Sequence, residues 1–159
     1  MDEARRELAA VLGRIPSGLF ILSVRQGQAE TGMLTSWVQQ CGFAPPLISV
    51  ALQRDRPIIA WLTQGAAFTL NILDDGQTDM VAHFGRGFTL EESAFAGLDI
   101  ERPPTGGPVL RKALAYLECR VTSRCPAGDH ELLLAEVLAG RVLNEGQPMV
   151  HIRRTGFHY

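Results

Sequence analysis

Short apolar segments of strand length recur along this chain, and turn residues separate them. Residues 19–24 are apolar almost throughout, as expected of a strand buried on both faces. Residues 113–123 alternate apolar and polar side chains, which is typical of a half-exposed antiparallel strand. The full set of such segments covers residues 19–24, 32–35, 47–52, 68–73, 113–123, 131–144 and 149–153. Six or seven short strands with local connections predict a mainly β fold, a closed antiparallel barrel with Greek-key connections.

The order of these segments also predicts how the strands are arranged. We expect residues 19–24 and 32–35 to form a hairpin, because a short polar turn lies between them. Residues 131–144 form a long strand that we expect to bend at Gly140. Residues 149–153 are then predicted to close the sheet.

Few helices are predicted, and all are short and peripheral. Residues 2–12 contain strong helix formers before Gly13, and residues 57–65 begin with Pro57 and end with Gly65. A third helix is predicted over residues 78–84. Residues 85–107 are rich in glycine and proline, with a small acidic helix-like piece at 91–95, and are predicted to be a surface excursion of the kind that covers ligands.

Composition limits the classes of function. The 159 residues suggest a single domain, and 46% hydrophobic residues support a real core. A net charge of −2 gives no electrostatic case for nucleic acid or for an anionic membrane. The charged amino end and the lack of long apolar runs argue against a secretory signal and a membrane span. Three cysteines without metal-ligand spacing suggest reduced thiols, no zinc site and a cytoplasmic location, and Cys119 is predicted to be a core residue.

Residues 31–56 contain the most suggestive arrangement of polar groups. A predicted loop at residues 36–40 carries hydrogen-bonding groups and the flat ring of Trp37, and the next strand ends at Arg54 and Arg56. A flat ligand with a phosphate tail needs an aromatic wall, backbone donors and forked arginine donors. The ordinary alternative is a turn with a packed indole, followed by a solvated strand end.

The motifs around this stretch resemble those of the flavin reductase-like family, the split barrels that bind flavin mononucleotide (FMN). They are T-S-W-V-x-Q-x-x-F-x-P-P at 35–46, the R-D-R tip at 54–56, F-T-L-N-I-L at 68–73, A-H-F at 82–84, G-G-P-V-L at 106–110, L-A-Y-L-E-C at 114–119, G-D-H at 128–130 and V-H-I-R-R-T-G-F-H-Y at 150–159. Their combination most resembles the C-terminal flavin reductase module of multidomain flavodiiron proteins of oxygenic phototrophs. The resemblance implies a split barrel that binds FMN and pairs as a homodimer with the flavin near the subunit interface.

The resemblance also implies a set of site residues. The implied cofactor-binding residues are Thr35, Ser36, Trp37, Val38, Gln39, Gln40, Leu52, Arg54, Arg56, Asn71, His83 and Phe84. The arginines are expected to hold the phosphate, and the loop at 36–40 to frame the flavin ring with its backbone donors. His130 matches the position that lines the nicotinamide side in the family, with an ordinary turn residue as the alternative. Trp37 either walls the flavin or fills the core, and the core is the favoured prediction.

The implied function is that of an NAD(P)H-dependent FMN oxidoreductase. Residues 1–159 would be one flavin reductase-like domain, excised from the C-terminus of a longer chain. It would pass electrons to diiron and flavodoxin-like domains of that chain, for oxygen reduction at a diiron centre elsewhere. Two alternatives remain open, a non-catalytic flavin-binding or dimerisation module, and a pyridoxamine-phosphate-oxidase-like or haem-binding split barrel.

Overall fold

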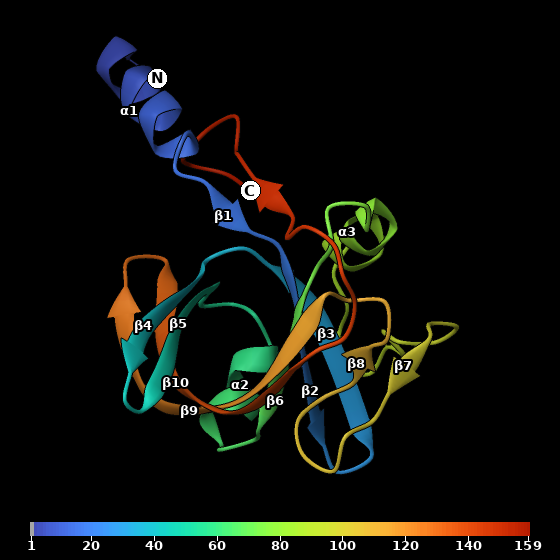
Figure 1. Ribbon diagram of the computed structural model, residues 1–159. Coiled ribbons are helices and arrows are strands. Elements are labelled where there is room, and N and C mark those ends of the chain that lie inside the picture. The colour runs from blue at the N-terminus through green and yellow to red at the C-terminus, as the bar shows by residue number, and fades with distance from the viewer. Residues whose placement is uncertain (1) are drawn as a thin grey trace.

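One curled antiparallel sheet dominates the structure, a computed structural model that describes residues 2–159. Seven strands form it in the order β3-β2-β6-β9-β10-β5-β4, and each neighbouring pair is antiparallel. Figure 1 shows the sheet bending round until β4 and β5 face β2 and β3 across the fold. The strands are β2 (Phe20–Gln26), β3 (Ala29–Thr35), β4 (Val38–Phe43), β5 (Pro46–Gln53), β6 (Phe68–Ile72), β9 (Ala115–Ala127) and β10 (His130–Val142). The mainly β prediction is therefore confirmed, as is the hairpin of β2 and β3.

The two ends of the sheet are consecutive along the chain. Strands β3 and β4 are joined directly through Ser36 and Trp37, but no ladder pairs them within the described residues. The backbone N–H of Ala51 donates to the carbonyl of Trp37 at 3.0 Å, which ties this connection to β5 instead.

The final predicted strand does not close this sheet. Residues 150–151 form β11 (Val150–His151), which pairs with β1 (Ser17–Gly18) in a separate two-stranded sheet. A second small sheet pairs β7 (Ile100–Glu101) with β8 (Val109–Leu110). The prediction that residues 149–153 close the main sheet was therefore wrong. This part of the chain pairs instead with β1, the short strand that follows the first helix.

The three predicted helices are confirmed as α1 (Glu3–Gly13), α2 (Ile58–Thr63) and α3 (Thr78–Gly85). Helix α1 projects from the body in Figure 1, and Asp2 caps it by accepting from the N–H of Arg5 at 2.8 Å. The helix-like piece at residues 91–95 is a series of turns instead. Ala94 and Phe95 are buried there against the body, so tertiary packing overrides the local helix preference.

Two apolar cores lie on the two faces of β2, as its unbroken apolar run predicts. Leu22 packs inside the curled sheet, and its neighbour Ile21 packs in a second core with Phe84 and Phe95. Cys119 is fully buried in the first core, which confirms its predicted role, and burial raises the pKa of its thiol to about 12. The register shifts of β10 lie between residues 134 and 139, before the bend predicted at Gly140.

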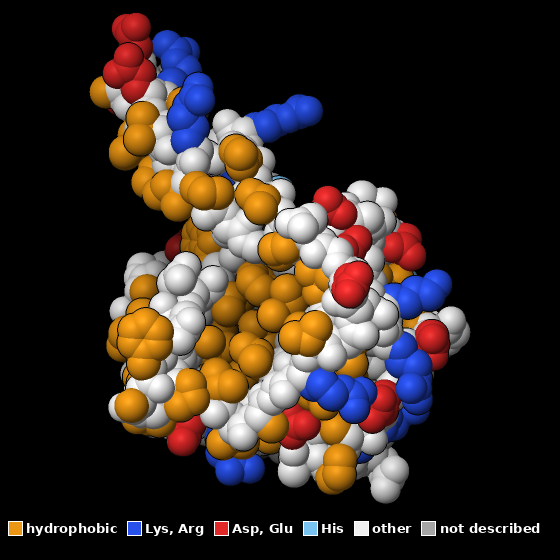
Figure 2. Space-filling model, viewed as in Figure 1, with side chains coloured by type: hydrophobic (Ala, Val, Ile, Leu, Met, Phe, Trp, Pro, Cys, Tyr) orange, Lys and Arg blue, Asp and Glu red, His pale blue; other side chains and the backbone are white. Residues whose placement is uncertain are grey.

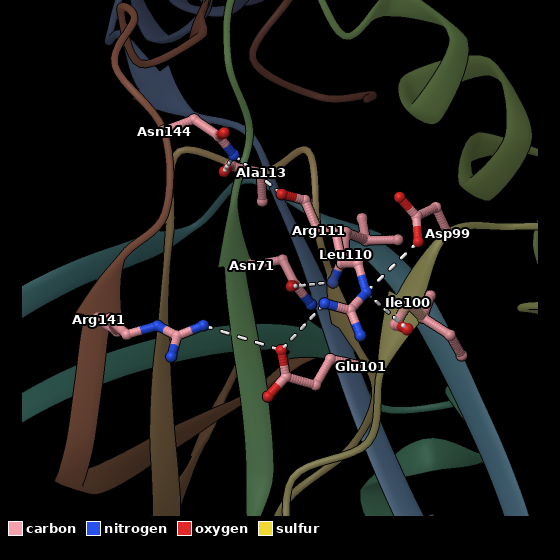
Figure 3. A network of polar contacts seen from close by, with 9 residues as sticks. All are labelled: Asn71, Asp99, Ile100, Glu101, Leu110, Arg111, Ala113, Arg141 and Asn144. Atoms are coloured by element: carbon pink, nitrogen blue, oxygen red, sulfur yellow. Dashed lines mark hydrogen bonds and ion pairs between the residues drawn. The ribbon is translucent and has the colours of Figure 1, made fainter.

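Asn71 joins the sheet to the surface excursion (Figure 3). It is fully buried, its amide donates to the carbonyls of Ile21 and Pro108 at 3.2 Å, and its carbonyl accepts from the N–H of Leu110 at 2.8 Å. Asn144 continues the network by donating to the carbonyl of Ala113 at 2.7 Å. A mid-strand asparagine is disfavoured unless it is satisfied in this way, so Asn71 fixes where the excursion returns to the body.

Candidate functional site

The first cavity has a volume of about 240 Å³ and lies where β3, the end of β5, α3 and the C-terminal segment meet. Most of its wall is apolar, with a few convergent polar groups, which is the usual composition of a small-molecule site. Its lining residues are Leu19, Thr31, Gly32, Met33, Leu34, Thr35, Ser36, Ala51, Leu52, Gln53, Arg56, Pro57, Ile58, Val81, Phe84, Gly85, Gly87, Phe88, Leu90, His151 and Tyr159.

Two hydroxyl-bearing residues line this cavity at the junction of β3 and β4. Thr35 and Ser36 are both buried, and both line the cavity. No hydrogen bond within residues 2–159 uses either side-chain oxygen, and no fully enclosed side-chain N or O atom of those residues lacks a partner. Both hydroxyls are therefore available as hydrogen-bond partners for a ligand.

Arg56 supplies the charge of the first cavity. Among its described lining residues, Arg56 is the only one whose side chain has a permanent charge, and none has an acidic side chain. The Arg56 guanidinium donates to the side-chain oxygen of Gln53 at 3.2 Å, which holds it at the end of β5. Arg54 lies elsewhere, because it is exposed and its Nε donates to the carbonyl of His130 at 3.2 Å. The two arginines of the R-D-R tip therefore have different surroundings.

The structure brings together five of the twelve predicted cofactor-binding residues: Thr35, Ser36, Leu52, Arg56 and Phe84 all line the first cavity. The predicted loop at 36–40 is a strand from Val38 onward. Gln39 pairs with Ser49 of β5, so the side chains of Gln39 and Gln40 are exposed on the edge strand β4 and lie outside the cavity lining.

Asn71 and His83 also lie outside the cavity lining. Asn71 is engaged in the buried network described above. His83 packs edge-on against Phe84 at 4.8 Å between ring centroids, and its Nε2 donates to the carbonyl of Ala94 at 2.8 Å. His83 therefore packs against Phe84, which lines the cavity, but does not line the cavity itself.

A second cavity of about 240 Å³ adjoins the first and contains Trp37 and His130. Its lining is Trp37, Gln53, Asp129, His130, Arg153, Gly156, Phe157, His158 and Tyr159. Trp37 is half-buried here, with its ring centroid 4.7 Å from that of His130 and 5.3 Å from that of Tyr159. The predicted core position for Trp37 was wrong, because the β3–β4 connection turns its indole toward the C-terminal segment instead of into the sheet.

Hydrogen bonds fix the ring of His130 from both sides. Its Nδ1 lies 2.6 Å from a carboxylate oxygen of Asp129, and its Nε2 lies 2.6 Å from the hydroxyl of Tyr159. A carboxylate only accepts, so Nδ1 carries the proton of the neutral ring and the tyrosine hydroxyl donates to Nε2. The hydrogen bond from His130 lowers the pKa of Asp129, and burial raises the pKa of Tyr159.

Several lining residues were not among the predicted site residues. Phe88 and Leu90 come from the excursion that was expected to cover a ligand, although no single residue there was chosen. His151 and Tyr159 lie in the C-terminal motif, which contributed to the resemblance but was given no site role. The signal in the sequence was the basic and aromatic character of that ending. Its place beside β3 could not be predicted, because the two segments lie far apart along the chain.

The chain belongs to the flavin reductase-like family. The model of this family, described as a flavin reductase like domain, matches residues 12–158. Among curated relatives, it is 39% identical over 155 residues to diflavin flavoprotein A 1 of Synechocystis sp., covering 96% of this chain. It is 38% identical over 161 residues to putative diflavin flavoprotein A 3 of Nostoc sp., covering all of this chain. The chain spans only 27% and 28% of the lengths of these two relatives.

Solved structures show the same fold. The Streptomyces globisporus NADH:FAD oxidoreductase SgcE6 superposes with a TM-score of 0.83 and 25% identity, covering 92% of this chain and 87% of that one. The structure of SgcE6 in complex with NAD and FAD fragments gives a TM-score of 0.79 at the same identity, covering 89% of this chain and 84% of the other.

Two further observations concern residues 2–159 alone. None of the helices described there is long and apolar enough to cross a membrane. The same residues contain no cluster of three or more histidine, cysteine or acidic side chains that could hold a metal ion.

Proposed function

We propose that this domain is an NAD(P)H-dependent flavin oxidoreductase module that binds FMN in the first cavity. The observation that carries the proposal is the combination, in one cavity, of an apolar wall, the unpaired hydroxyls of Thr35 and Ser36, and the guanidinium of Arg56. A planar ring needs an apolar wall, and a phosphate tail needs hydroxyl and guanidinium donors.

The residues of the first cavity fit this cofactor in chemistry. We assign the phosphate to Arg56 with Thr35 and Ser36, because these donors share one cavity that contains no acidic side chain. The apolar side chains of Met33, Leu52 and Phe88 would exclude water from the ring. Bound flavin would supply the redox chemistry by accepting a hydride and passing electrons on. We assign no ring contact to Gln39 or Gln40, whose side chains are exposed on β4.

The second cavity is proposed to receive the nicotinamide donor. It adjoins the first cavity and presents the aromatic face of Trp37 beside His130, whose orientation Asp129 and Tyr159 fix. Hydride transfer requires two rings held in contact, so the role of these residues is to position a ring, and no acid or base is needed. The similarity to an NADH:FAD oxidoreductase supports use of a nicotinamide donor.

The electrons are proposed to leave for other domains of a longer chain. The relatives are named diflavin flavoproteins, and this chain matches about a quarter of their length. We propose that residues 1–159 are the C-terminal module of such a protein and serve oxygen reduction at a diiron centre in a sibling domain. We also propose that β3 and β4 together form the closure of a split barrel, since they are joined by two residues.

A homodimer is proposed because apolar side chains remain uncovered on the projecting first helix and near β11. Leu8, Val11 and Ile15 on and after α1, and Val150 and Ile152 near β11, are all exposed. Figure 2 shows apolar side chains both along this projecting arm and in the hollow below it. A cavity of about 240 Å³ is somewhat smaller than the roughly 300–1,000 Å³ of typical ligand sites. A second copy would supply the missing wall.

An anaerobic titration tests the proposal. FMN is added to the purified protein, NADPH or NADH follows, and the flavin absorbance near 450 nm is recorded. We expect saturable binding of FMN and bleaching of its absorbance at a rate far above that of free FMN with the same donor. Binding without bleaching would leave the non-catalytic module as the correct description, and a Soret band in the purified protein would indicate a haem protein.

A further inference from the structure

Tyr159 stands between the two cavities. The residue lines both of them, a position that it shares only with Gln53 among the described residues. Gln53 belongs to β5 and is fixed there by its pairing with His130. Tyr159, by contrast, belongs to the C-terminal segment. Of the two residues that the cavities share, it is therefore the one that is not part of the sheet.

The C-terminal segment is anchored up to residue 156 and then depends on side chains. The N–H of Arg153 donates to the carbonyl of Gly13 at 3.2 Å, and the N–H of Gly156 donates to the carbonyl of Ala9 at 2.7 Å, which fixes this part against α1. Beyond residue 157, no backbone hydrogen bond is found within the described residues.

Contacts of its side chain with two residues, His130 and Trp37, therefore hold Tyr159 in place. Its hydroxyl donates to Nε2 of His130 at 2.6 Å, and its ring lies 5.3 Å from that of Trp37 in a tilted arrangement. The net stability that a single hydrogen bond contributes is small, so thermal fluctuations open such a bond readily. The docked position of Tyr159 is therefore one that a competing planar ligand can displace.

We propose that Tyr159 is a movable partition: docked on His130 it keeps the two cavities apart, and undocked it joins them into one cleft. This inference rests on the proposed function, in which a flavin ring occupies the first cavity and a nicotinamide ring enters the second. The nicotinamide ring then takes the place of the tyrosine ring against Trp37 and His130. Opening of the partition is required for the two rings to meet, so it sets the apparent affinity for the donor.

The thermodynamic consequence is specific. When a ligand binds only the undocked state, its apparent dissociation constant is the intrinsic value divided by the undocked fraction. Weakening the docked state raises that fraction and tightens apparent donor binding. The limiting rate of hydride transfer at saturating donor is not changed, because every molecule is then undocked.

The test uses the full chain with Tyr159→Phe, which keeps the ring and removes the hydroxyl. Tyr116→Phe is the matched control, since it also removes one tyrosine hydroxyl and Tyr116 lines neither cavity. All variants carry Trp61→Phe, so that Trp37 is the single tryptophan. Two quantities are measured: acrylamide quenching of Trp37 fluorescence in the flavin-free protein, and the dependence of flavin bleaching on NADPH concentration in the FMN-loaded protein.

We expect Tyr159→Phe to increase the quenching constant of Trp37 about twofold or more. We also expect it to lower the apparent dissociation constant for NADPH about 2- to 10-fold, at an unchanged limiting rate. Tyr116→Phe should change neither quantity. Unchanged quenching together with unchanged NADPH affinity would overturn the partition.

A large fall in the limiting rate would also overturn it, because Tyr159 would then be a wall that aligns the donor ring. Increased quenching in a protein that neither binds nor bleaches FMN would support the partition and refute the proposed function. The fluorescence and bleaching measurements thus separate the two claims.

Discussion

The guanidinium of Arg153 lies over the indole of Trp37, with 4.9 Å between Cζ and the ring centroid. The same guanidinium donates to the carbonyl of Leu12 at 3.4 Å and to that of Gly156 at 3.5 Å. One side chain therefore joins the first helix, the C-terminal segment and the β3–β4 connection. This contact places Tyr159 within reach of His130, and so links the end of α1 to the boundary between the two cavities.

Arg56→Ala should weaken FMN binding about 10- to 100-fold, because a charge-assisted contact with a phosphate contributes roughly 1.5–3 kcal/mol. Arg54→Ala is the matched control and should change binding less than about threefold, since Arg54 lies outside the cavity lining. Riboflavin, which lacks the phosphate, should bind both variants as it binds the wild type. Fluorescence titration measures all of these affinities. An equal loss of FMN and riboflavin affinity in Arg56→Ala would remove Arg56 from the phosphate site.

Trp37→Ala should destabilise the protein by about 1–2 kcal/mol, less than the roughly 3–5 kcal/mol typical of an aromatic side chain deleted from a core. The reason is that Trp37 is half-buried and lies against Arg153, His130 and Tyr159, outside both apolar cores. Phe68→Ala, at a fully buried core position, provides the comparison. Urea denaturation of the two variants measures the difference, and equal losses would place Trp37 in the core after all.

Asn71→Ala should cost about 2–4 kcal/mol of stability, because it leaves the buried N–H of Leu110 without its acceptor and removes one donor each from the carbonyls of Ile21 and Pro108. The affinity of the folded fraction for FMN should change less than about threefold, since Asn71 does not line the first cavity. Urea unfolding and an FMN titration below the unfolding transition measure both effects. A stable variant with lost FMN binding would return Asn71 to the cofactor site.

The docking of Tyr159 should hold across neutral pH and weaken at both extremes. The pKa of Asp129 is lowered in the folded protein, so its hydrogen bond to His130 is present above the unfolded pKa of roughly 4 and is lost as the pH falls through the folded value. The pKa of Tyr159 is raised, so its protonated state persists up to the unfolded value of roughly 10 and is lost only above it. Acrylamide quenching of Trp37 should therefore be flat between about pH 5 and 9. A change of quenching inside this pH range would contradict this account of the contact.

Val11→Asp should weaken a homodimer at least about tenfold without unfolding the monomer, because Val11 is 64% exposed on the projecting helix. Phe43→Asp is a suitable control, since Phe43 is 91% exposed at the distant hairpin of β4 and β5. Light scattering over micromolar concentrations measures the mass of each variant. A monomeric wild type in the presence of FMN would refute the dimer.

The strands and helices could largely be predicted from the sequence, because hydrophobic periodicity and turn residues are local signals. The unbroken run around Ile21 and Leu22 was rightly interpreted as a strand buried on both faces. The partner of residues 149–153 was not predictable, since pairing with β1 depends on where α1 ends and not on the segment itself.

The site was predicted in part for the same reason. Thr35, Ser36, Leu52, Arg56 and Phe84 lie where motifs end strands or a helix, and all five line the first cavity. The exposure of Gln39 and Gln40 follows from pairing of β4 with β5, which turned a presumed loop into an edge strand. Tyr159 was missed because only the fold brings the C-terminal segment beside His130.

The most direct measurement for the central claim is an amide chemical-shift titration of the ¹⁵N-labelled protein with FMN. If FMN occupies the first cavity, the largest shifts should fall on residues 31–36, 51–56 and 84–90, which supply most of its lining. Repeating the titration with Arg56→Ala should require a higher FMN concentration for the same shifts. Shifts confined to the separate cavity around residues 74–79, 97–99 and 144–145, or no saturable shifts at all, would contradict the proposed site.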